Sequence, residues 1–384
     1  MLCILSSAVG GCIRCSGILF AIALHLTVPV VVVEAESPDR PLRLAFTGDI
    51  MAHDVNFRMS DYDRIYAPVS SYFDHADYTF GQLEFVVDPD RPMATYPRFN
   101  VHPSYVEAAI TSGINVFSIA NNHTTDYEAD GVRATLASLS RLAERYGIYY
   151  SGARTRPDHE FEVTSIEWKG KQIGYLAITR ILNDYSGSEL TYYVSHDPEK
   201  AASFLETLRE VTSGYDLFIL SVHDGTEYRP IPDARTIRFY REAVDAGVDI
   251  LWGHHPHVLQ PWEYVERESG SRAVIMASMG NFISGQTWRL DPDDFANWRA
   301  STGDSAVFRA AVEFTGTGAT VADVDSVPIT HYKHPDGGVT VEKLMPMRLR
   351  DDVTPAWRAF YRYRARASAG FFRRYDYEQM RGME

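Results

Sequence analysis

Apolar and polar positions along the chain form a repeating pattern of short apolar runs and longer amphipathic segments. The apolar runs are rich in β-branched and aromatic residues, which is typical of buried strands, and they span residues 43–47, 78–86, 115–120, 216–222 and 248–253. Between them, apolar residues recur with the period of a helix over 103–112, 129–146, 198–212 and 234–246. This alternation of strands and helices predicts an α/β fold.

Other strands follow one another without a helix between them. A hairpin is expected over 161–168 and 172–178, joined by Lys169-Gly170-Lys171, and further strands are expected over 274–278, 306–314 and 320–327. Such a succession predicts an antiparallel part of the sheet structure. From Thr354 onward the pattern is basic, aromatic and helical, and this segment can pack against the core or face a partner or a membrane surface.

The N-terminus has the pattern of a targeting segment. Arg14 precedes an apolar run over 17–33, and small residues that resemble a cleavage site follow it. We therefore expect a signal peptide or membrane anchor over 1–35 and a linker over 36–41, with lipid attachment at Cys12 as a further alternative. The expected location is the periplasmic or extracellular face of the cell envelope.

Composition narrows the classes of function. The chain has 384 residues, a formal charge of -14 and no basic run, so nucleic-acid binding is not expected. An acidic protein also repels an anionic substrate unless bound cations reverse the local field. All three cysteines lie near the N-terminus, which leaves the body without a thiol nucleophile or cysteine-ligated zinc.

Polar residues follow several of the predicted strands directly. They are Asp49, Glu84, Asn122 with His123, His223 and His255. Sites in α/β sheets form at the carboxyl ends of strands, where such side chains meet. The densest group is Gly253-His254-His255-Pro256-His257, and a His-x-His pair on extended backbone places both rings on the same side.

The donor types favour a metal site. Carboxylate, amide and imidazole groups without thiolates suit one or two divalent metal ions, which can be Zn, Mn, Fe or Mg. Each residue alone also has a simpler explanation: Asp49 can belong to a turn, Glu84 to an edge strand and His223 to the core.

Six motifs occur in one order along the chain. They are Thr47-Gly48-Asp49-Ile50-Met51, Gln82-Leu83-Glu84, Ala120-Asn121-Asn122-His123 with Asp126 and Gly131, the segment 223–228, the segment 253–261 and the segment 278–286. The whole set resembles the CapA family of poly-γ-glutamate capsule synthesis proteins, a branch of the metallophosphatase-like (calcineurin-like) superfamily. The resemblance implies a four-layer α/β/β/α sandwich of metallophosphoesterase type over 42–345 and a C-terminal helical extension over 346–384.

The resemblance also implies roles for individual residues. The implied metal ligands are Asp49, Glu84, Asn122, His223, His255 and His257. The implied catalytic pair is His123 as general acid and Asp126 as its orienting partner. The residues expected to line the substrate pocket are His53, His254, Glu227, Tyr228, Asn281 and Gln286.

The chain departs from the superfamily motifs at several positions. Met51 stands where the first motif has a histidine, Glu84 replaces an aspartate and Asn121 replaces a glycine. Asp224 stands where the CapA family usually has a tryptophan after the fourth-motif histidine. Loss of the histidine leaves open whether one metal ion or two are bound, and His53 is a candidate for the missing nitrogen.

These features favour an exported, metal-dependent hydrolase that acts in capsule or poly-γ-glutamate synthesis, export or processing. The electrophile would be phosphorus or the amide carbon of a γ-linked glutamate polymer, and fold alone does not decide between them. The alternatives are a non-catalytic component that binds or guides the polymer and an exported structural protein with a relic site. Expected partners are an anionic polymer or phosphoester and capsule synthesis or export proteins, with membrane contact only through the N-terminal segment.

Overall fold

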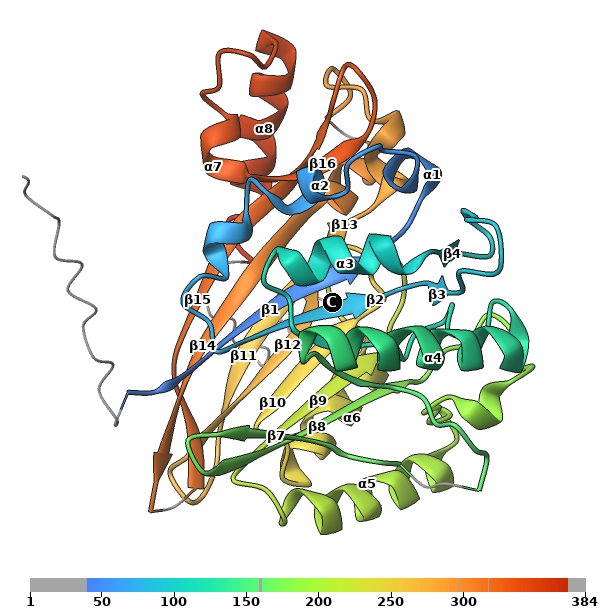
Figure 1. Ribbon diagram of the computed structural model, residues 1–384. Coiled ribbons are helices and arrows are strands. Elements are labelled where there is room, and N and C mark those ends of the chain that lie inside the picture. The colour runs from blue at the N-terminus through green and yellow to red at the C-terminus, as the bar shows by residue number, and fades with distance from the viewer. Residues whose placement is uncertain (1–39, 159–160, 296, 317, 372–384) are drawn as a thin grey trace, which may run out of the picture. The chain divides into compact units, whose positions relative to one another are not determined.

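Two β-sheets form the centre of the computed structural model (Figure 1). The structure describes residues 40–158, 161–295, 297–316 and 318–371. The expected signal peptide or anchor and residues 372–384 lie outside these ranges, so the expectations about them stay predictions. Within the described residues, no helix is both long and apolar enough to cross a membrane.

The first sheet combines parallel and antiparallel strands. In spatial order it contains β16 (Val339–Lys343), β15 (Gly318–Lys333), β14 (Asp304–Thr315), β1 (Leu42–Ile50), β2 (Tyr78–Leu83), β5 (Val116–Ser118) and β6 (Tyr149–Ser151), while β13 (Asn281–Ile283) pairs with β1. Within this sheet β1, β2, β5 and β6 run parallel to one another. The pairs β1–β14, β14–β15 and β15–β16 are antiparallel. The predicted antiparallel part is therefore confirmed.

The second sheet has a parallel centre and antiparallel edges. Its order is β11 (Leu259–Glu266), β12 (Arg272–Met279), β10 (Ile250–His254), β9 (Leu217–His223), β8 (Lys171–Thr179) and β7 (Thr164–Trp168). The four central strands run parallel, so several of their carboxyl ends meet at one edge. The edge strands β7 and β11 pair antiparallel with β8 and β12.

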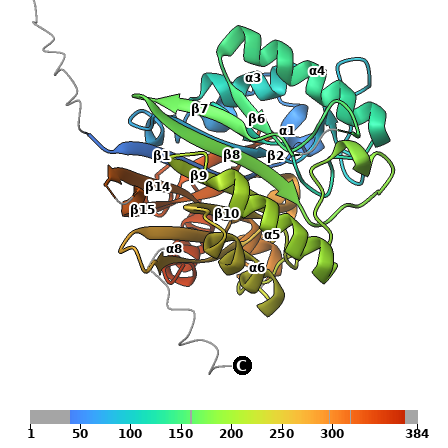
Figure 2. The same ribbon diagram turned by 90° about the horizontal axis from the view of Figure 1, so that it is seen from below.

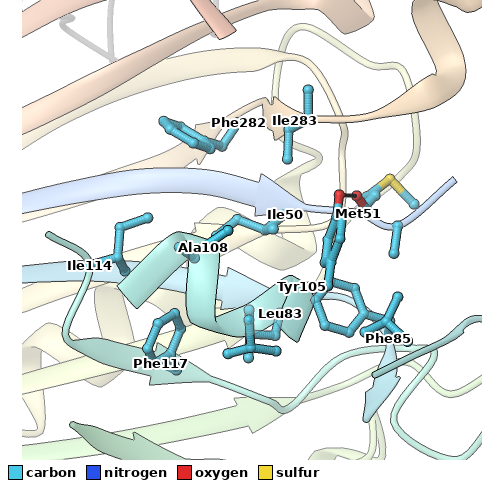
Figure 3. Close-up of a cluster of buried hydrophobic side chains, with 14 of the residues drawn as sticks. Ile50, Met51, Leu83, Phe85, Tyr105, Ala108, Ile114, Phe117, Phe282 and Ile283 are labelled. Carbon is cyan, nitrogen blue, oxygen red and sulfur yellow. Dashed lines mark hydrogen bonds between the residues drawn. The ribbon is translucent and has the colours of Figure 1, made fainter. Parts of the chain in front are cut away.

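Helices cover the outer faces of both sheets. Figure 2 shows α3 (Pro103–Thr111) and α4 (Glu128–Tyr146) on one side and α5 (Pro198–Thr212) and α6 (Ala234–Asp245) on the other. Apolar side chains of α3 pack on the first sheet (Figure 3), as do those of α4, and those of α5 and α6 pack on the second. These layers confirm the expected four-layer α/β/β/α sandwich.

The remaining elements are short or lie outside the four layers. They are the helices α1 (Asp54–Phe57), α2 (Asp63–Tyr66), α7 (Leu344–Met347) and α8 (Pro355–Ala367), the 3₁₀ helices Ser70–Tyr72, Ser188–Leu190, Gly285–Arg289 and Trp298–Gly303, and the strand pair β3 (Val86–Val87) and β4 (Asn100–Val101).

The core between the sheets is strongly aromatic. Phe46 and Phe80 of the first sheet stack at a ring-centroid distance of 4.6 Å, and the Trp252 ring of the second sheet lies 5.7 and 5.8 Å from them. Trp252 Nε1 donates a hydrogen bond of 2.9 Å to the carbonyl oxygen of Thr47, which satisfies its one buried donor. This contact fixes β10 against β1 just before both strands reach the polar edge.

One strand prediction is wrong in its extent. The apolar run 78–86 was expected to be continuous, but β2 ends at Leu83 and the next two residues leave the sheet. The amide of Glu84 still donates to the carbonyl oxygen of Ile50 at 3.0 Å, after which Val86 and Val87 pair with β4 instead. Residues 83–87 are all buried. Because the residues before and after the break are equally buried, the apolar pattern does not reveal where the strand ends.

The described part of the C-terminal extension packs against the core. Thr354 caps α8 by accepting a hydrogen bond from the amide of Trp357. Tyr361 donates to the carbonyl oxygen of His331 at 3.0 Å, and Arg364 forms a buried ion pair with Asp304 of β14. Packing against the core is thus the arrangement observed for this helix.

Close backbone approach at the edge of the sheets requires glycine. A Cβ atom on Gly48 would lie 1.8 Å from the carbonyl oxygen of Gly280, and one on Gly253 would lie 2.2 Å from that of Ala277. These two glycines directly precede Asp49 and His254. The absence of side chains there allows the strands to bring the polar residues together.

We predict that Gly48→Ala lowers the free energy of unfolding by about 3 kcal/mol, because the new methyl group collides with backbone that cannot move freely. Gly214→Ala is the matched control, since its nearest neighbour would lie at an ordinary contact distance of 3.5 Å. Urea denaturation of both variants measures the difference. Equal stability of the two variants would contradict the argument.

Candidate metal centre

The polar residues at the strand ends converge from both sheets. Asp49 lies at the end of β1, Glu84 directly after β2, and Asn122 in the loop after β5. From the second sheet, His223 and His254 end the neighbouring strands β9 and β10, where they are register partners. All of these side chains are buried.

Asp49 connects the two sheets through two histidines. Its Oδ1 accepts a hydrogen bond from His254 Nδ1 at 2.9 Å, and its Oδ2 accepts one from His257 Nδ1 at 3.2 Å. Burial raises the pKa of Asp49, but these hydrogen bonds and the charges of both histidines outweigh burial and hold the pKa well below its usual range. Asp49 is therefore a carboxylate at neutral pH.

Several buried polar atoms near Asp49 have no partner. Both carboxylate oxygens of Glu84, Nδ1 of His223 and Nδ1 of His255 make no hydrogen bond within the described parts of the chain. Burial raises the pKa of Glu84 well above its ordinary value. A buried carboxylate without a partner is costly, whereas a cation bound at this point would satisfy the oxygens and the nitrogens together.

These atoms form two groups with the spacing of metal ligands. The first group contains Asp49, Glu84 and His223, and the second contains Glu227, His255 and His257. Within each group one ligand atom per residue lies within 4.8 Å of the others. Oδ1 of Asn122 lies 2.9 Å from His223 Nε2 and so adjoins the first group. The structure brings all six expected ligands together, and metal binding by them stays a prediction.

The histidines differ in their protonation. Burial lowers the pKa of His255 to about 3 and that of His223 well below its usual range, so both rings are neutral, as metal ligation requires. Burial also opposes the charged form of His257, but Glu84, Asp49 and Glu227 surround this ring and raise its pKa to about 9. The surroundings of His257 thus attract positive charge.

His123 and Asp126 form the expected pair beside this cluster. Nδ1 of His123 lies 2.8 Å from Oδ2 of Asp126, and the same oxygen accepts from the amide of Phe99 at 2.6 Å. Asn121 holds the loop by accepting from the amide of His123 and by donating to the carbonyl oxygen of Leu83. The asparagine that replaces the superfamily glycine therefore ties His123 to the backbone next to Glu84.

A cavity of about 730 Å³ opens beside the cluster. His123, His257 and four of the expected substrate residues line it, namely His53, Glu227, Tyr228 and Gln286. The other two expected substrate residues, His254 and Asn281, do not line it. Contact of these four residues with a substrate stays a prediction.

His254 and Asn281 are buried away from the cavity, and contact of either residue with a substrate stays a prediction. His254 is 1% exposed and Asn281 is fully buried, because they lie beneath the ligand cluster. His254 holds Asp49, and Oδ1 of Asn281 accepts a hydrogen bond of 3.0 Å from His257 Nδ1. Their observed contacts orient other side chains of the cluster.

Sequence reasoning missed two residues near the centre. Nδ2 of Asn183 lies 3.4 Å from the ring nitrogens of His123. Arg180 is buried, forms an ion pair of 3.4 Å with Asp224 and lies 3.8 Å from the ring centroid of Phe239. His196 Nε2 also contacts Asp224, at 2.8 Å. These residues follow a strand without a distinctive motif, so only their three-dimensional neighbours indicate their roles.

The loop that follows β10 has an unusual backbone. His255 and His257 have φ angles of 96° and 58°, and the nearby Tyr228 has 63°. Positive φ is unfavourable for residues with side chains and persists where the surrounding structure enforces it, often at functional sites. The amide of Tyr228 donates to the carbonyl oxygen of Pro256 at 2.8 Å, which joins the two segments.

Comparison with known proteins identifies the family of this chain. Residues 43–286 match the family of bacterial capsule synthesis proteins PGA_cap, and the chain belongs to this family. It is 28% identical to the capsule biosynthesis protein CapA of Bacillus anthracis over 329 residues, which cover 81% of this chain and 74% of that protein. It is 27% identical to the PGA biosynthesis protein CapA of Bacillus subtilis (strain 168) over 319 residues, with coverage of 77% and 78%.

Among solved structures, the chain is similar to the calcineurin-like phosphoesterase YfkN from Bacillus subtilis. The TM-score is 0.40 and the sequence identity 12%, over 87% of this chain and 98% of that chain. The four-layer architecture described above stands on the sheet order and helix packing of this chain itself.

We predict that removal of divalent metal by a chelator destabilises the protein. A metal ion at about a hundred times its dissociation constant adds about 2.7 kcal/mol to the free energy of unfolding, because only the folded chain assembles the site. The Glu84→Gln variant should lose most of this response, since its amide carries no charge to attract the ion. Denaturation with and without added Mn²⁺ or Zn²⁺ measures the effect, and unchanged midpoints in the parent protein would refute it.

Proposed function

We propose that this chain is an exported, metal-dependent hydrolase that acts on an anionic polymer or phosphoester during capsule synthesis. The observation that carries the proposal is the buried carboxyl group of Glu84, which has no hydrogen-bond partner in the described chain, among the histidines of the centre and beside the His123–Asp126 pair and an open cavity. Export is proposed from the apolar segment over 17–33.

The residues of the two groups would hold one or two divalent ions. Their carboxylate, amide and imidazole atoms suit Zn, Mn, Fe or Mg, and the unpartnered atoms fit such an ion. A bound ion would lower the pKa of a water molecule and polarise the electrophilic centre of the substrate. His123 would donate a proton from Nε2 to the leaving group, since Asp126 engages its Nδ1.

The wall of the cavity supports an anionic substrate. Arg289, Arg299 and Lys333 line it, and none of them forms an ion pair with a carboxylate of the described chain. The Arg299 guanidinium lies 4.5 Å from the ring centroid of Trp298, which is 49% exposed. In a chain with a formal charge of -14, such a local basic wall would attract an anion that the rest of the surface repels.

The names of the relatives suggest which polymer this is. One relative is a PGA biosynthesis protein and the other a capsule biosynthesis protein. A γ-linked glutamate polymer carries one carboxylate on each residue, so the basic wall would bind the chain while the metal centre meets one amide bond. Hydrolysis of a phosphoester is the alternative reaction at the same centre.

A specific observation favours a second candidate function. Met51 supplies no nitrogen where the superfamily motif has a histidine, so the centre can be too weak for catalysis and the protein can bind or guide the polymer without cleaving it. Under this hypothesis the metal is structural or grips the polymer carboxylates.

We predict that His123→Gln lowers kcat by about 100-fold or more while the bound metal is retained, because only the proton donor is lost. Turnover of poly-γ-glutamate and of a phosphodiester such as bis(p-nitrophenyl) phosphate measures activity, and elemental analysis measures metal. His75→Gln, at an exposed position, is the control. An Asp49→Ala variant should lose turnover together with metal.

The outcomes separate the candidate functions. Full activity of the metal-stripped protein would refute metal-dependent hydrolysis. Polymer binding without turnover, and unchanged in His123→Gln, would instead support the binding or guiding component.

A further inference from the structure

The second ligand group, Glu227, His255 and His257, lacks the histidine that the superfamily motif has at the position of Met51. Met51 is 2% exposed and belongs to the apolar cluster beneath α3 (Figure 3). Its backbone oxygen accepts from Tyr105, and its thioether is a soft donor that hard divalent ions do not prefer. Another residue must therefore provide the third ligand if a second ion binds.

His53, the nearest histidine in sequence, does not fill this role. Its Nδ1 accepts a hydrogen bond of 3.1 Å from the amide of Gly285, and its ring packs edge-on against Phe99 at 5.1 Å. Among the described residues, it belongs to neither of the two groups with ligand spacing. In this arrangement the Nδ1 atom of His53 is engaged by the backbone, and the ring joins neither ligand group.

Glu227 lies beside His257 and is the acidic residue of the second group. Its Oε1 lies 4.0 Å from His257 Nε2, too far for a hydrogen bond but suitable for two ligands of one ion. Glu227, His255 and His257 form the second group, and Oε1 of Glu84 lies 3.7 Å from the same His257 nitrogen. Because Nδ1 of His257 is held by Asp49 and Asn281, Nε2 is the nitrogen left for a metal.

The loop that carries Glu227 is held in place at several points. The amide of Tyr228 donates to the carbonyl oxygen of Pro256, and Gln286 Nε2 donates to the Tyr228 hydroxyl at 3.3 Å. Thr226 donates to Asp233 at 3.1 Å. Glu227 therefore stands between two anchored neighbours, as a preorganised ligand should.

The negative charge of Glu227 argues against a role as a direct contact for an anionic substrate. No Lys or Arg of the described chain forms an ion pair with it, although Arg289, Arg299 and Lys333 line the same cavity. A bare carboxylate at this position would repel the anionic substrate that those cations attract. A divalent ion bound to Glu227 would remove that conflict.

We propose that Glu227 replaces the histidine absent at Met51 and completes a second metal site with His255 and His257. This inference rests on the proposed metal-dependent function and specifies its second ion. Two histidines and one glutamate form a ligand set that suits Zn²⁺ with an open position. The Glu227 side chain is 45% exposed toward the cavity, so the open position would face the substrate.

The number of metal ions that the full chain binds tests this inference, and the measurement needs no substrate. The metal-stripped protein is titrated with Zn²⁺ by calorimetry, and retained zinc is counted by elemental analysis after gel filtration. We expect two zinc ions per chain in the parent protein and one in Glu227→Gln, with the second site weakened about 100-fold or more. Glu144→Gln, at an exposed position on α4, should bind two. Circular dichroism and the unfolding midpoint verify that each variant is folded.

Cobalt provides an independent spectroscopic measurement. Co²⁺ in a site with histidine nitrogens absorbs in the visible range, and the spectrum of the second equivalent should disappear in Glu227→Gln and in Glu227→Ala. Two zinc ions retained by both variants, or one zinc ion in the parent protein, would overturn the inference while leaving the hydrolase proposal to its own turnover assay. A parent protein that binds no metal would overturn both.

Discussion

The contact on which the site depends is the one that Asp49 makes across the two sheets. Asp49, the last residue but one of β1 in the first sheet, accepts hydrogen bonds from His254, which ends β10 of the second sheet, and from His257 in the loop that follows. A buried carboxylate is stable only with such partners, and charge-assisted hydrogen bonds are stronger than neutral ones. Glycines at 48 and 253 allow the backbones to approach closely enough for this contact. The aromatic core behind it keeps both strands in register.

The centre gathers buried acidic groups whose charged forms the protein stabilises only in part. Asp49 accepts hydrogen bonds from two histidines, whereas the oxygens of Glu84 have no hydrogen-bond partner in the described chain, and Oε1 lies 3.7 Å from His257 Nε2. The raised pKa of His257 has the same origin, since carboxylates on several sides attract a proton to its ring. A divalent cation is the group that such an arrangement accommodates best. The basic wall of the cavity lies next to this centre, so an anionic substrate would meet favourable charge on both sides.

Much of this arrangement was predictable from the chain. The strands that carry Asp49, His223 and His254 at their carboxyl ends were visible as apolar runs, and the carboxyl ends of parallel strands in one sheet meet at one edge. The break after Leu83 was not visible, because every residue on both sides of it is buried. A motif shows that residues such as His254 and Asn281 lie near a site, but not whether they lie in its wall or beneath it. Asn183 and Arg180 had no local signal at all.

The sequence by itself determined the main helices and strands, the α/β class with its antiparallel part and the set of candidate ligands, because these follow from the period of the apolar positions and from residues that are close along the chain. The four-layer architecture was implied by the resemblance of the motifs to a known family. Only the tertiary structure decided how the ligands divide into two groups and that Glu227, rather than His53, lies beside His257. The physical reason is that this pairing depends on the path of a loop and on hydrogen bonds such as that between Tyr228 and Pro256. Contacts of this kind join segments distant in sequence, and no local pattern encodes their geometry.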